Sequence, residues 1–376
     1  MLVPSLPLTG VRSRAPLRLG LAGGGTDVSP YPEQYGGAVL NATINRYAFA
    51  FIEPSPDWKV RFIATDLEVE ETFALDLEAI STARLKLHAA VYSRMVREFA
   101  GGCPLAITVR TLVDAPAGSG LGSSSALVVA LVEAFRAVLD LPLGAYEIAH
   151  LAFEVERIDL GLAGGKQDQY AAAFGGINFI EFMADNKVIV NPLRISRATL
   201  NELETSLITC FSGISRQSDE IIEHQKQGIL NKSAKTLESL HLLKGDAIEM
   251  KRALLLADIP AMALILNRSW AAKKETSSAV TNQRIDELNA RALETGALAG
   301  KVSGAGGGGF IMFIVPPERR FNIIRSLNDT GAAASPVQFT SVGAESWVVP
   351  TASPMSSQSA SAGRGRPFNA ATSNLR

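Results

Sequence analysis

The 376-residue sequence has little of what several protein classes require. Its two cysteines, Cys103 and Cys210, lack the CxxC spacing of zinc and redox sites, and we expect both to be buried free thiols of a cytoplasmic protein. The four histidines are scattered and indicate neither a metal site nor a catalytic triad. With 36 basic and 37 acidic residues, there is no charge excess to attract nucleic acid or a membrane surface.

Long apolar runs are also missing. No stretch of about eighteen apolar residues is free of charge, and the first ten residues lack the basic start and apolar centre of a secretory signal. Hydrophobic residues nevertheless make up 47% of the chain. This composition predicts an ordered cytoplasmic protein, long enough for two domains that each bury a core.

Strand and helix patterns are mixed along the chain without strict alternation, which favours an α+β fold. We expect a first domain over residues 11–195, a second over 196–350, and a disordered Ser- and Ala-rich tail over 351–376. The expected strands are 39–52, 106–113, 177–182, 206–211 and 310–315. The expected helices are 81–100, 126–139, 145–160, 167–174, 259–272 and 281–295, and long helical segments are expected over 217–256.

The most informative segment is the loop Pro116–Ser125, which joins a predicted strand to a predicted helix. Its three glycines can turn backbone N–H groups toward one point, and the following helix start favours negative charge. A Walker loop is excluded because neither Lys166 nor Lys301 precedes a Ser or Thr. The segment is therefore a phosphate-binding loop of another kind, or a structural turn with a serine N-cap.

Two further glycine-rich segments accompany this loop, at residues 14–27 and 301–310. Together the three segments resemble the signature motifs of the GHMP small-molecule kinases, in the same order and over about residues 11–350. Within that superfamily, residues 23–31 and 164–172 are most similar to the D-glycero-D-manno-heptose 7-phosphate kinases.

The resemblance implies a two-domain GHMP kinase fold, with an N-terminal domain like domain 2 of ribosomal protein S5 and a ferredoxin-like C-terminal domain. It implies ATP and Mg²⁺ as cofactors and phosphorylation of the anomeric hydroxyl of heptose 7-phosphate. The 1,7-bisphosphate product would be a precursor of nucleotide-activated heptose for surface polysaccharide. The implied ATP-binding residues are Pro116, Gly118, Ser119, Gly120, Leu121, Gly122, Ser123, Ser124 and Ser125.

Asp168 and Arg18 are the candidate catalytic residues. By pattern alone Asp168 is a carboxylate at a helix start, but it matches the aspartate proposed as general base in this family. Arg18 could lower the cost of the developing alkoxide or hold Asp168 ionised. The alternative for Arg18 is a surface position on an edge strand.

Ser124 and Glu156 match the residues that bind Mg²⁺ in the family. One hydroxyl and one carboxylate are sufficient for this ion, which also takes phosphate oxygens and water. A shift of the match from Glu156 to Glu154 stays open, as does a role of both glutamates as solvated charges.

The candidate substrate-binding residues come from all three motifs and from the second half of the chain. Asp27 matches an acceptor of sugar hydroxyls, and Gly24 and Gly25 replace a Glu-His pair of the galactokinases, which fits a larger sugar. Arg216, and after it Lys273 and Lys274, could hold the distal phosphate. The full set is Gly24, Gly25, Thr26, Asp27, Gly165, Asp168, Arg216, Gly306 and Gly307.

Residues 304–309 satisfy a GxGxxG pattern, but a strand follows them instead of a helix, so a dinucleotide site is excluded. We expect these glycines to allow close backbone approach to the phosphate loop or the substrate. Three other interpretations of the function remain. The protein could be a kinase for fucose or an octose phosphate, a kinase for isoprenoid alcohols or homoserine, or a catalytically silent nucleotide-binding protein. The expected partners are ATP and a small sugar phosphate, without nucleic acid or membrane; a homodimer stays open.

Overall fold

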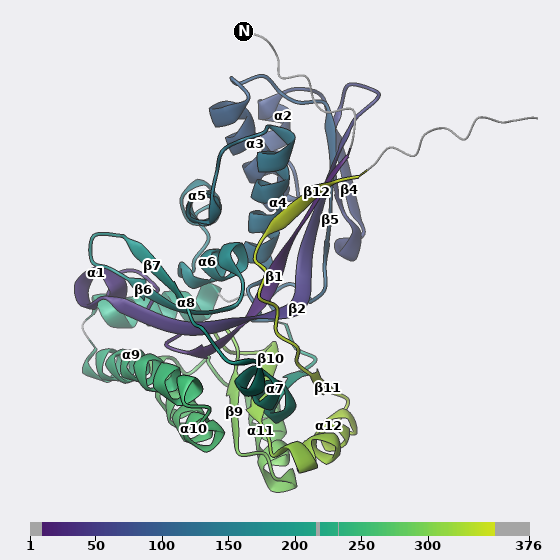
Figure 1. Cartoon of the computed structure of the whole chain (residues 1–376). Coiled ribbons are helices and arrows are strands. Elements are labelled where there is room, and N and C mark those ends of the chain that lie inside the picture. The colour runs from purple at the N-terminus through teal and green to yellow at the C-terminus, as the bar shows by residue number, and fades with distance from the viewer. Residues whose placement is uncertain (1–9, 216–218, 232, 350–376) are drawn as a thin grey trace, which may run out of the picture.

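The computed structural model describes residues 10–215, 219–231 and 233–349. Two sheets of eight and four strands organise the chain, and Figure 1 shows the larger sheet standing above the smaller one. The central strands of the larger sheet run in the order β12 (Glu345–Val348), β1 (Val11–Ala22), β2 (Gly37–Pro54), β5 (Ile107–Val113), β3 (Val60–Ala64) and β4 (Val69–Phe73). β6 (Ile177–Phe182) pairs with β2 and β7 (Val188–Pro192).

The long strand β2 holds the larger sheet together. Its first residues pair with β6, from Gly37 opposite Phe182, whereas its later residues pair with β5, from Ala48 opposite Val113. β1 lies antiparallel to β2 and buries Leu17, Leu19 and Leu21. β1 is therefore an internal strand, and the side chains that it carries next to these leucines are held in fixed positions.

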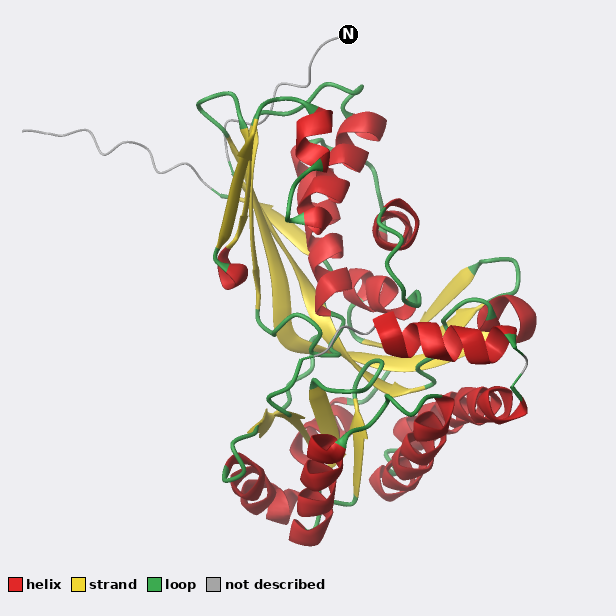
Figure 2. Ribbon diagram, turned by 180° about the vertical axis from the view of Figure 1, so that it is seen from behind, coloured by secondary structure: helices red, strands yellow, loops and turns green. Residues whose placement is uncertain are grey.

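Helices cover one face of the larger sheet, as Figure 2 shows. The central one, α4 (Ser123–Val138), packs on β1 and β2 and is buried on most of its surface, as expected for a predominantly apolar helix. The other helical elements of this half are α1 (Tyr31–Tyr35), η1 (Thr65–Leu67), α2 (Leu77–Ser81), α3 (Lys86–Phe99), α5 (Ala145–Glu154), η2 (Val155–Asp159) and α6 (Gln167–Phe174).

The smaller sheet is antiparallel throughout and has the order β11 (Ala333–Pro336), β8 (Leu207–Phe211), β10 (Phe310–Ile314) and β9 (Ala299–Val302). A helical hairpin of α9 (Ala234–Leu255) and α10 (Ile259–Thr276) packs against β1, β2 and β9 and so joins the two halves. The remaining helical elements are α7 (Arg197–Ser206), α8 (Asp219–Leu230), α11 (Gln283–Thr295), η3 (Pro317–Arg319) and α12 (Arg320–Asn328).

The last strand departs from the order of the chain. β12 follows the smaller sheet in sequence but pairs with β1 of the larger sheet, from Val348 opposite Val11, and Figure 1 shows it rising in yellow beside β1. Residues 345–348 thus belong to the N-terminal sheet, although the pattern assigned them to the second domain. The domain boundary near residue 195 stays a prediction.

The predicted mixture of helices and strands is confirmed, with several shifted boundaries. Helix α4 begins at Ser123 instead of residue 126, and α10 ends at Thr276 instead of residue 272. Helix 81–100 was predicted to begin five residues too early, because α3 begins at Lys86. The N–H groups of Arg84 and Leu85 donate to the carboxylate of Glu71, both at 2.9 Å, so this segment is held by a neighbouring strand. The helical segments predicted over 217–256 correspond to α8, which ends at Leu230, and α9, which begins at Ala234.

The prediction of two buried thiols is wrong for one cysteine. Cys210 is buried in β8, but Cys103 is exposed, because it follows a turn at Gly101 and Gly102 with positive φ. The predicted tail, residues 351–376, lies outside the described residues. Within the described ranges, no helix is both long enough and apolar enough to cross a membrane.

Candidate active site

The loop between β5 and α4 has the backbone of an anion site. Gly118, Gly120 and Gly122 have φ values of +70°, +79° and +74°, which only glycine adopts at little cost. The N-cap residue of α4 is Gly122, and no side chain caps the helix. The N–H groups of the first turn therefore keep the capacity to bind a phosphate, and a serine-capped structural turn is not what the loop forms.

Six of the nine residues predicted to bind ATP line one cavity: Gly118, Gly120, Gly122, Ser123, Ser124 and Ser125. The other three support the loop from behind. The carbonyl of Leu121 accepts the N–H of Arg18 at 3.0 Å, that of Ser119 accepts the N–H of Phe310 at 2.9 Å, and that of Pro116 accepts the N–H of Ser119 at 3.2 Å.

The third glycine-rich motif packs directly on this loop. A Cβ at Gly309 would lie 2.2 Å from the carbonyl oxygen of Ser119, and a Cβ at Gly304 would lie 2.7 Å from that of Gly120. The predicted close backbone approach is confirmed. Gly306 and Gly307 lie beside Val280 instead, and Gly304 and Ala305 are the residues of this motif that line the cavity.

Arg18 and Asp168 form an ion pair beside the phosphate loop. Arg18 Nε lies 2.7 Å and Nη2 lies 2.6 Å from Asp168 Oδ1, while Nη1 donates to the carbonyl of Gly120 at 2.7 Å and to Ser303 Oγ at 3.2 Å. The Arg18 side chain is 4% exposed and that of Asp168 is 23% exposed. The alternative of a surface arginine on an edge strand is thereby excluded, and one guanidinium connects all three motifs to the carboxylate.

Glu156 lies in the π-helical turn η2, which continues α5. π-Turns are rare and often found at functional sites. The Glu156 carboxylate is fully buried and accepts hydrogen bonds from Ser124 Oγ, at 2.9 Å, and from Gln169 Nε2. Glu154 instead faces Arg94, with 3.4 Å between Oε2 and Nη1. Of the two glutamates, Glu156 is the one brought to Ser124.

Asp27 lies against the segment that leads to Asp168. Its carboxylate is 1% exposed and accepts hydrogen bonds from the N–H of Gln167 at 3.1 Å, from Gln167 Nε2 at 3.0 Å and from the N–H of Gly25 at 3.3 Å. Burial raises the pKa of this carboxyl, and the backbone hydrogen bond from Gln167 opposes that shift. Gly165 packs on Asp27, whereas Thr26 is bonded to the backbone of Gly23 and Ala38 and does not line the cavity.

These groups share a cavity of about 350 Å³ between the two halves of the chain. Gly25, Asp27, Gly165 and Asp168 line it, and Gly24 lies at its edge, where a Cβ would come 3.7 Å from Lys273 Nζ. Arg216 lies outside the described residues. Of the two lysines named after it for the distal phosphate, Lys273 lines the cavity, whereas Lys274 is exposed, does not line it and is not placed to hold a phosphate there. The three motifs, which are far apart in sequence, therefore meet around one cleft.

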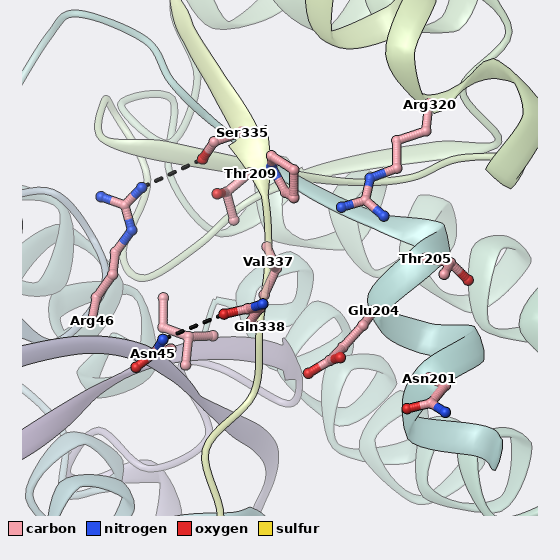
Figure 3. Close-up of a pocket in the computed structure, with 12 residues that line it drawn as sticks. Asn45, Arg46, Asn201, Glu204, Thr205, Thr209, Arg320, Ser335, Val337 and Gln338 are labelled. Carbon is pink, nitrogen blue, oxygen red and sulfur yellow. Dashed lines mark hydrogen bonds between the residues drawn. The ribbon is translucent and has the colours of Figure 1, made fainter. Parts of the chain in front are cut away.

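A second cavity, of about 510 Å³, lies by β11 and α7 (Figure 3). Arg46 and Arg320 stand on opposite sides of the segment that carries Val337 and Gln338, and Arg46 donates to Ser335 Oγ at 3.4 Å. No residue of the three glycine motifs lines this cavity. We therefore take the smaller cleft as the candidate active site.

Comparison with known proteins identifies the family. The model of the GHMP kinase N-terminal domain matches residues 86–176, and the model of the C-terminal domain matches residues 250–333. The chain is 43% identical over 337 residues to the D-glycero-alpha-D-manno-heptose 7-phosphate kinase of Campylobacter jejuni subsp. jejuni, covering 90% of this chain and 98% of that one. The chain belongs to the GHMP kinase family.

Other members of the family are similar in structure or sequence. A D-glycero-D-manno-heptose 1-phosphate kinase from Bacteriodes thetaiotaomicron has a TM-score of 0.77 at 42% identity, over 91% of this chain and all of that one. The L-fucokinase/L-fucose-1-P guanylyltransferase of Bacteroides fragilis is 26% identical over 81% of this chain and 34% of that one. The predicted fold and the predicted enzyme class, an ATP-dependent sugar kinase of the GHMP superfamily, are confirmed.

The residues at the start of α4 fit the Mg²⁺ ion predicted for a GHMP kinase. Ser124 Oγ and Glu156 Oε1 are hard oxygen donors 2.9 Å apart, beside the helix start that favours phosphate. In the described part of the chain, no cluster of three or more His, Cys, Asp or Glu residues is arranged to hold a metal. A metal at Ser124 would therefore take its other ligands from nucleotide and water.

Several side chains that hold the proposed site residues in place were not singled out by their sequence pattern. Gln167, Gln169 and Gln225 bond to Asp27, Glu156 and the carbonyl of Gly25, and Ser303 bonds to Arg18. Neutral amides and hydroxyls give no signal of their own in a sequence. Gln167 and Gln169 could have been found only by their position on either side of Asp168.

Proposed function

We propose that this GHMP kinase transfers the γ-phosphoryl group of ATP to the anomeric hydroxyl of D-glycero-D-manno-heptose 7-phosphate. The product is the 1,7-bisphosphate. The observation that carries the proposal is the 43% identity, over nearly the whole chain, to a heptose 7-phosphate kinase. The pairing of Arg18 with Asp168 beside an uncapped helix start supports it chemically.

The geometry of the cleft supports the following roles. The triphosphate of ATP would lie along residues 118–125, and Ser124 and Glu156 would hold Mg²⁺, which would neutralise charge on the phosphates. Asp168 accepts the proton of the anomeric hydroxyl as that oxygen bonds to the γ-phosphorus, and the bond from this phosphorus to the oxygen that bridges it to the β-phosphorus breaks. Arg18 keeps the Asp168 carboxylate oriented by its two nitrogens on Oδ1.

The role that we propose for Asp27 differs from that of a carboxylate that is free to accept hydrogen bonds from sugar hydroxyls. Three N–H groups already occupy its carboxylate, so at most one lone-pair direction is left for a sugar hydroxyl. We propose that Asp27 chiefly fixes residues 165–168 and so positions the base. Gly24 and Gly25 leave room for a heptose, and an ATP-consuming enzyme of this kind is expected to act in the cytoplasm.

The named relatives disagree on the acceptor, since one is called a 7-phosphate kinase and another a 1-phosphate kinase. The fucokinase adds an unphosphorylated sugar as an alternative. Purified enzyme should be assayed for ADP release with heptose 7-phosphate, heptose 1-phosphate, fucose, an octose phosphate, mevalonate and homoserine. Phosphorus NMR of the product then assigns the new phosphate to carbon 1 or carbon 7.

Highest kcat/KM for heptose 7-phosphate, with the new signal at carbon 1, is the expected result. If heptose 1-phosphate is the only compound phosphorylated, the proposed acceptor is wrong and heptose 1-phosphate takes its place. ATP binding without turnover of any acceptor would support the catalytically silent alternative.

A further inference from the structure

Lys273 is a buried cation in the cleft that the proposed roles do not use. It lies in the last turn of α10, is 5% exposed and lines the same cavity as Arg18, Asp168 and the phosphate loop. Its Nζ donates to the carbonyl of Gly304 at 2.5 Å. The ammonium group has three N–H donors, and among the described residues this is the one hydrogen bond that it forms.

The position of Nζ follows from its neighbours. Gly304 packs on Gly120 of the phosphate loop, and on the other side of Nζ lies Gly24 of the first motif. The ammonium group therefore stands where the phosphate loop meets the wall predicted to bind the sugar. A group held at this point faces the space in which the γ-phosphoryl group passes to the acceptor.

Arg18 has little capacity left to bind the phosphoryl group. Nε and Nη2 of its guanidinium contact Asp168, and Nη1 donates to Gly120 and Ser303. Four of its five N–H groups are thus used by the protein itself. Lys273 keeps N–H groups for a ligand, and a buried donor without a partner costs free energy until a ligand satisfies it.

The charged groups around Lys273 come from several elements. Arg18 on β1 and Lys301 on β9 repel it, whereas Asp27 after β1 and Asp168 on α6 attract it. Burial, and after it Arg18, lowers the pKa of Lys273 to about 8. A cation with little solvation of its own gains strongly from an anionic ligand.

We propose that Lys273 is a catalytic cation that donates hydrogen bonds to the phosphoryl group in transfer. The inference rests on the proposed function in that it takes the cleft as the site of phosphoryl transfer. It does not depend on which sugar is the acceptor. Lys273 acts from the C-terminal half, opposite the Mg²⁺ ligands of the N-terminal half.

The test compares Lys273→Met, Lys273→Arg and the matched control Lys274→Met, which removes an exposed lysine one residue further along α10. We expect Lys273→Met to lower kcat about 100-fold or more, with KM for ATP and sugar changed less than about threefold. Lys274→Met should keep the wild-type kcat. Circular dichroism, melting temperature and binding of a non-hydrolysable ATP analogue establish that each variant is folded.

A pH profile gives a second readout. The wild-type kcat/KM for ATP should fall as pH rises through about 8, because kcat/KM reports the free enzyme, in which Lys273 then loses its proton. Lys273→Arg should keep part of the activity and lose this alkaline limb, since a guanidinium stays charged. An unchanged kcat in a folded Lys273→Met variant overturns the proposal, and so does a raised KM for the sugar alone.

Failure of this inference can be distinguished from failure of the proposed function. If the wild-type enzyme prefers another acceptor, the same variants are assayed with that acceptor. The proposed substrate is then wrong, while the comparison of Lys273 with Lys274 still decides the role of the cation.

Discussion

Arg18 and Asp168 are 150 residues apart in the chain, yet two nitrogens of one guanidinium lie within 2.7 Å of a single carboxylate oxygen. The remaining nitrogen bonds to the phosphate loop and to the third glycine motif. The orientation of the proposed base therefore depends on the same side chain that holds the three motifs together.

The first prediction concerns the carboxylate. Asp168→Asn keeps the shape of the side chain but removes the group that accepts the proton, and we expect kcat to fall by about 10³-fold. The ATP analogue should bind within a few-fold of its wild-type affinity, measured by calorimetry. Turnover near the wild-type rate would remove Asp168 from its assigned role.

The second prediction separates the buried pair from a surface pair on the same strand. Arg18→Met leaves a partly buried carboxylate without its partner, and we expect a loss of about 2–4 kcal/mol in unfolding free energy together with a fall in kcat. Arg14 pairs with Glu345, with both side chains more than one third exposed, so Arg14→Met should cost less than about 1 kcal/mol. Urea unfolding measures both, and equal losses would contradict the assigned role of Arg18.

The third prediction tests the contact between the glycine motifs. Gly309 and Gly331 have nearly the same φ, +80° and +79°, but a Cβ at Gly309 meets the backbone of Ser119 whereas one at Gly331 has open space. Gly331→Ala should cost only the strain of the left-handed conformation, about 1–2 kcal/mol. Gly309→Ala should in addition displace the phosphate loop and weaken binding of the ATP analogue at least tenfold. Equal effects on nucleotide binding would show that the contact does not hold the loop.

Local patterns predicted the phosphate loop, its helix and the helix 167–174, because these depend on glycine spacing and on residues adjacent in sequence. The pairing of β12 with β1 depends on contacts between distant segments, which periodicity does not record. The contact of Arg18 with Asp168 also joins distant segments, and it was offered as one of two possible roles of Arg18 only through the family resemblance. The family match favoured Glu156 but left Glu154 open, and the π-turn gives the physical reason for Glu156, since one extra residue in a helical turn changes which side chain faces the cleft. Cys103 was predicted to be buried because cysteine is usually a buried residue type. It is exposed because it follows the turn at Gly101 and Gly102.

The fourth prediction distinguishes the two glutamates. Glu156→Gln replaces the carboxylate that Ser124 and Gln169 contact, so the Mg²⁺ concentration for half-maximal activity should rise at least tenfold. Gln169→Leu removes the hydrogen bond that orients Glu156 and should raise that concentration about tenfold. Glu154→Gln is the control, and magnesium titration of the reaction rate should give its wild-type value. A response to Glu154→Gln in place of Glu156→Gln would reverse the assignment.

The fifth prediction follows from Lys301, a lysine of β9 that is 3% exposed and lies 3.4 Å and 3.5 Å from the carbonyl oxygens of Gly20 and Leu21. Burial, with Lys273 as the second cause, lowers its pKa to about 7 from the ordinary 10.5. Between these values the unfolded chain binds more protons than the folded one, so this group makes the unfolding free energy rise as pH increases from 7 to 10.5.

Lys301→Met removes the cost of burying this charge, and we expect it to raise the unfolding free energy at pH 7 by about 1–3 kcal/mol. The variant should also flatten the gain in melting temperature between pH 7 and pH 9.5. Lys187→Met is the control, because Lys187 is 77% exposed and pairs with Asp185 at the surface. A Lys301→Met protein that is less stable than wild type at pH 7 would mean that the ammonium group is a net stabilising contact between β9 and β1, since its hydrogen bonds would then outweigh its lost solvation.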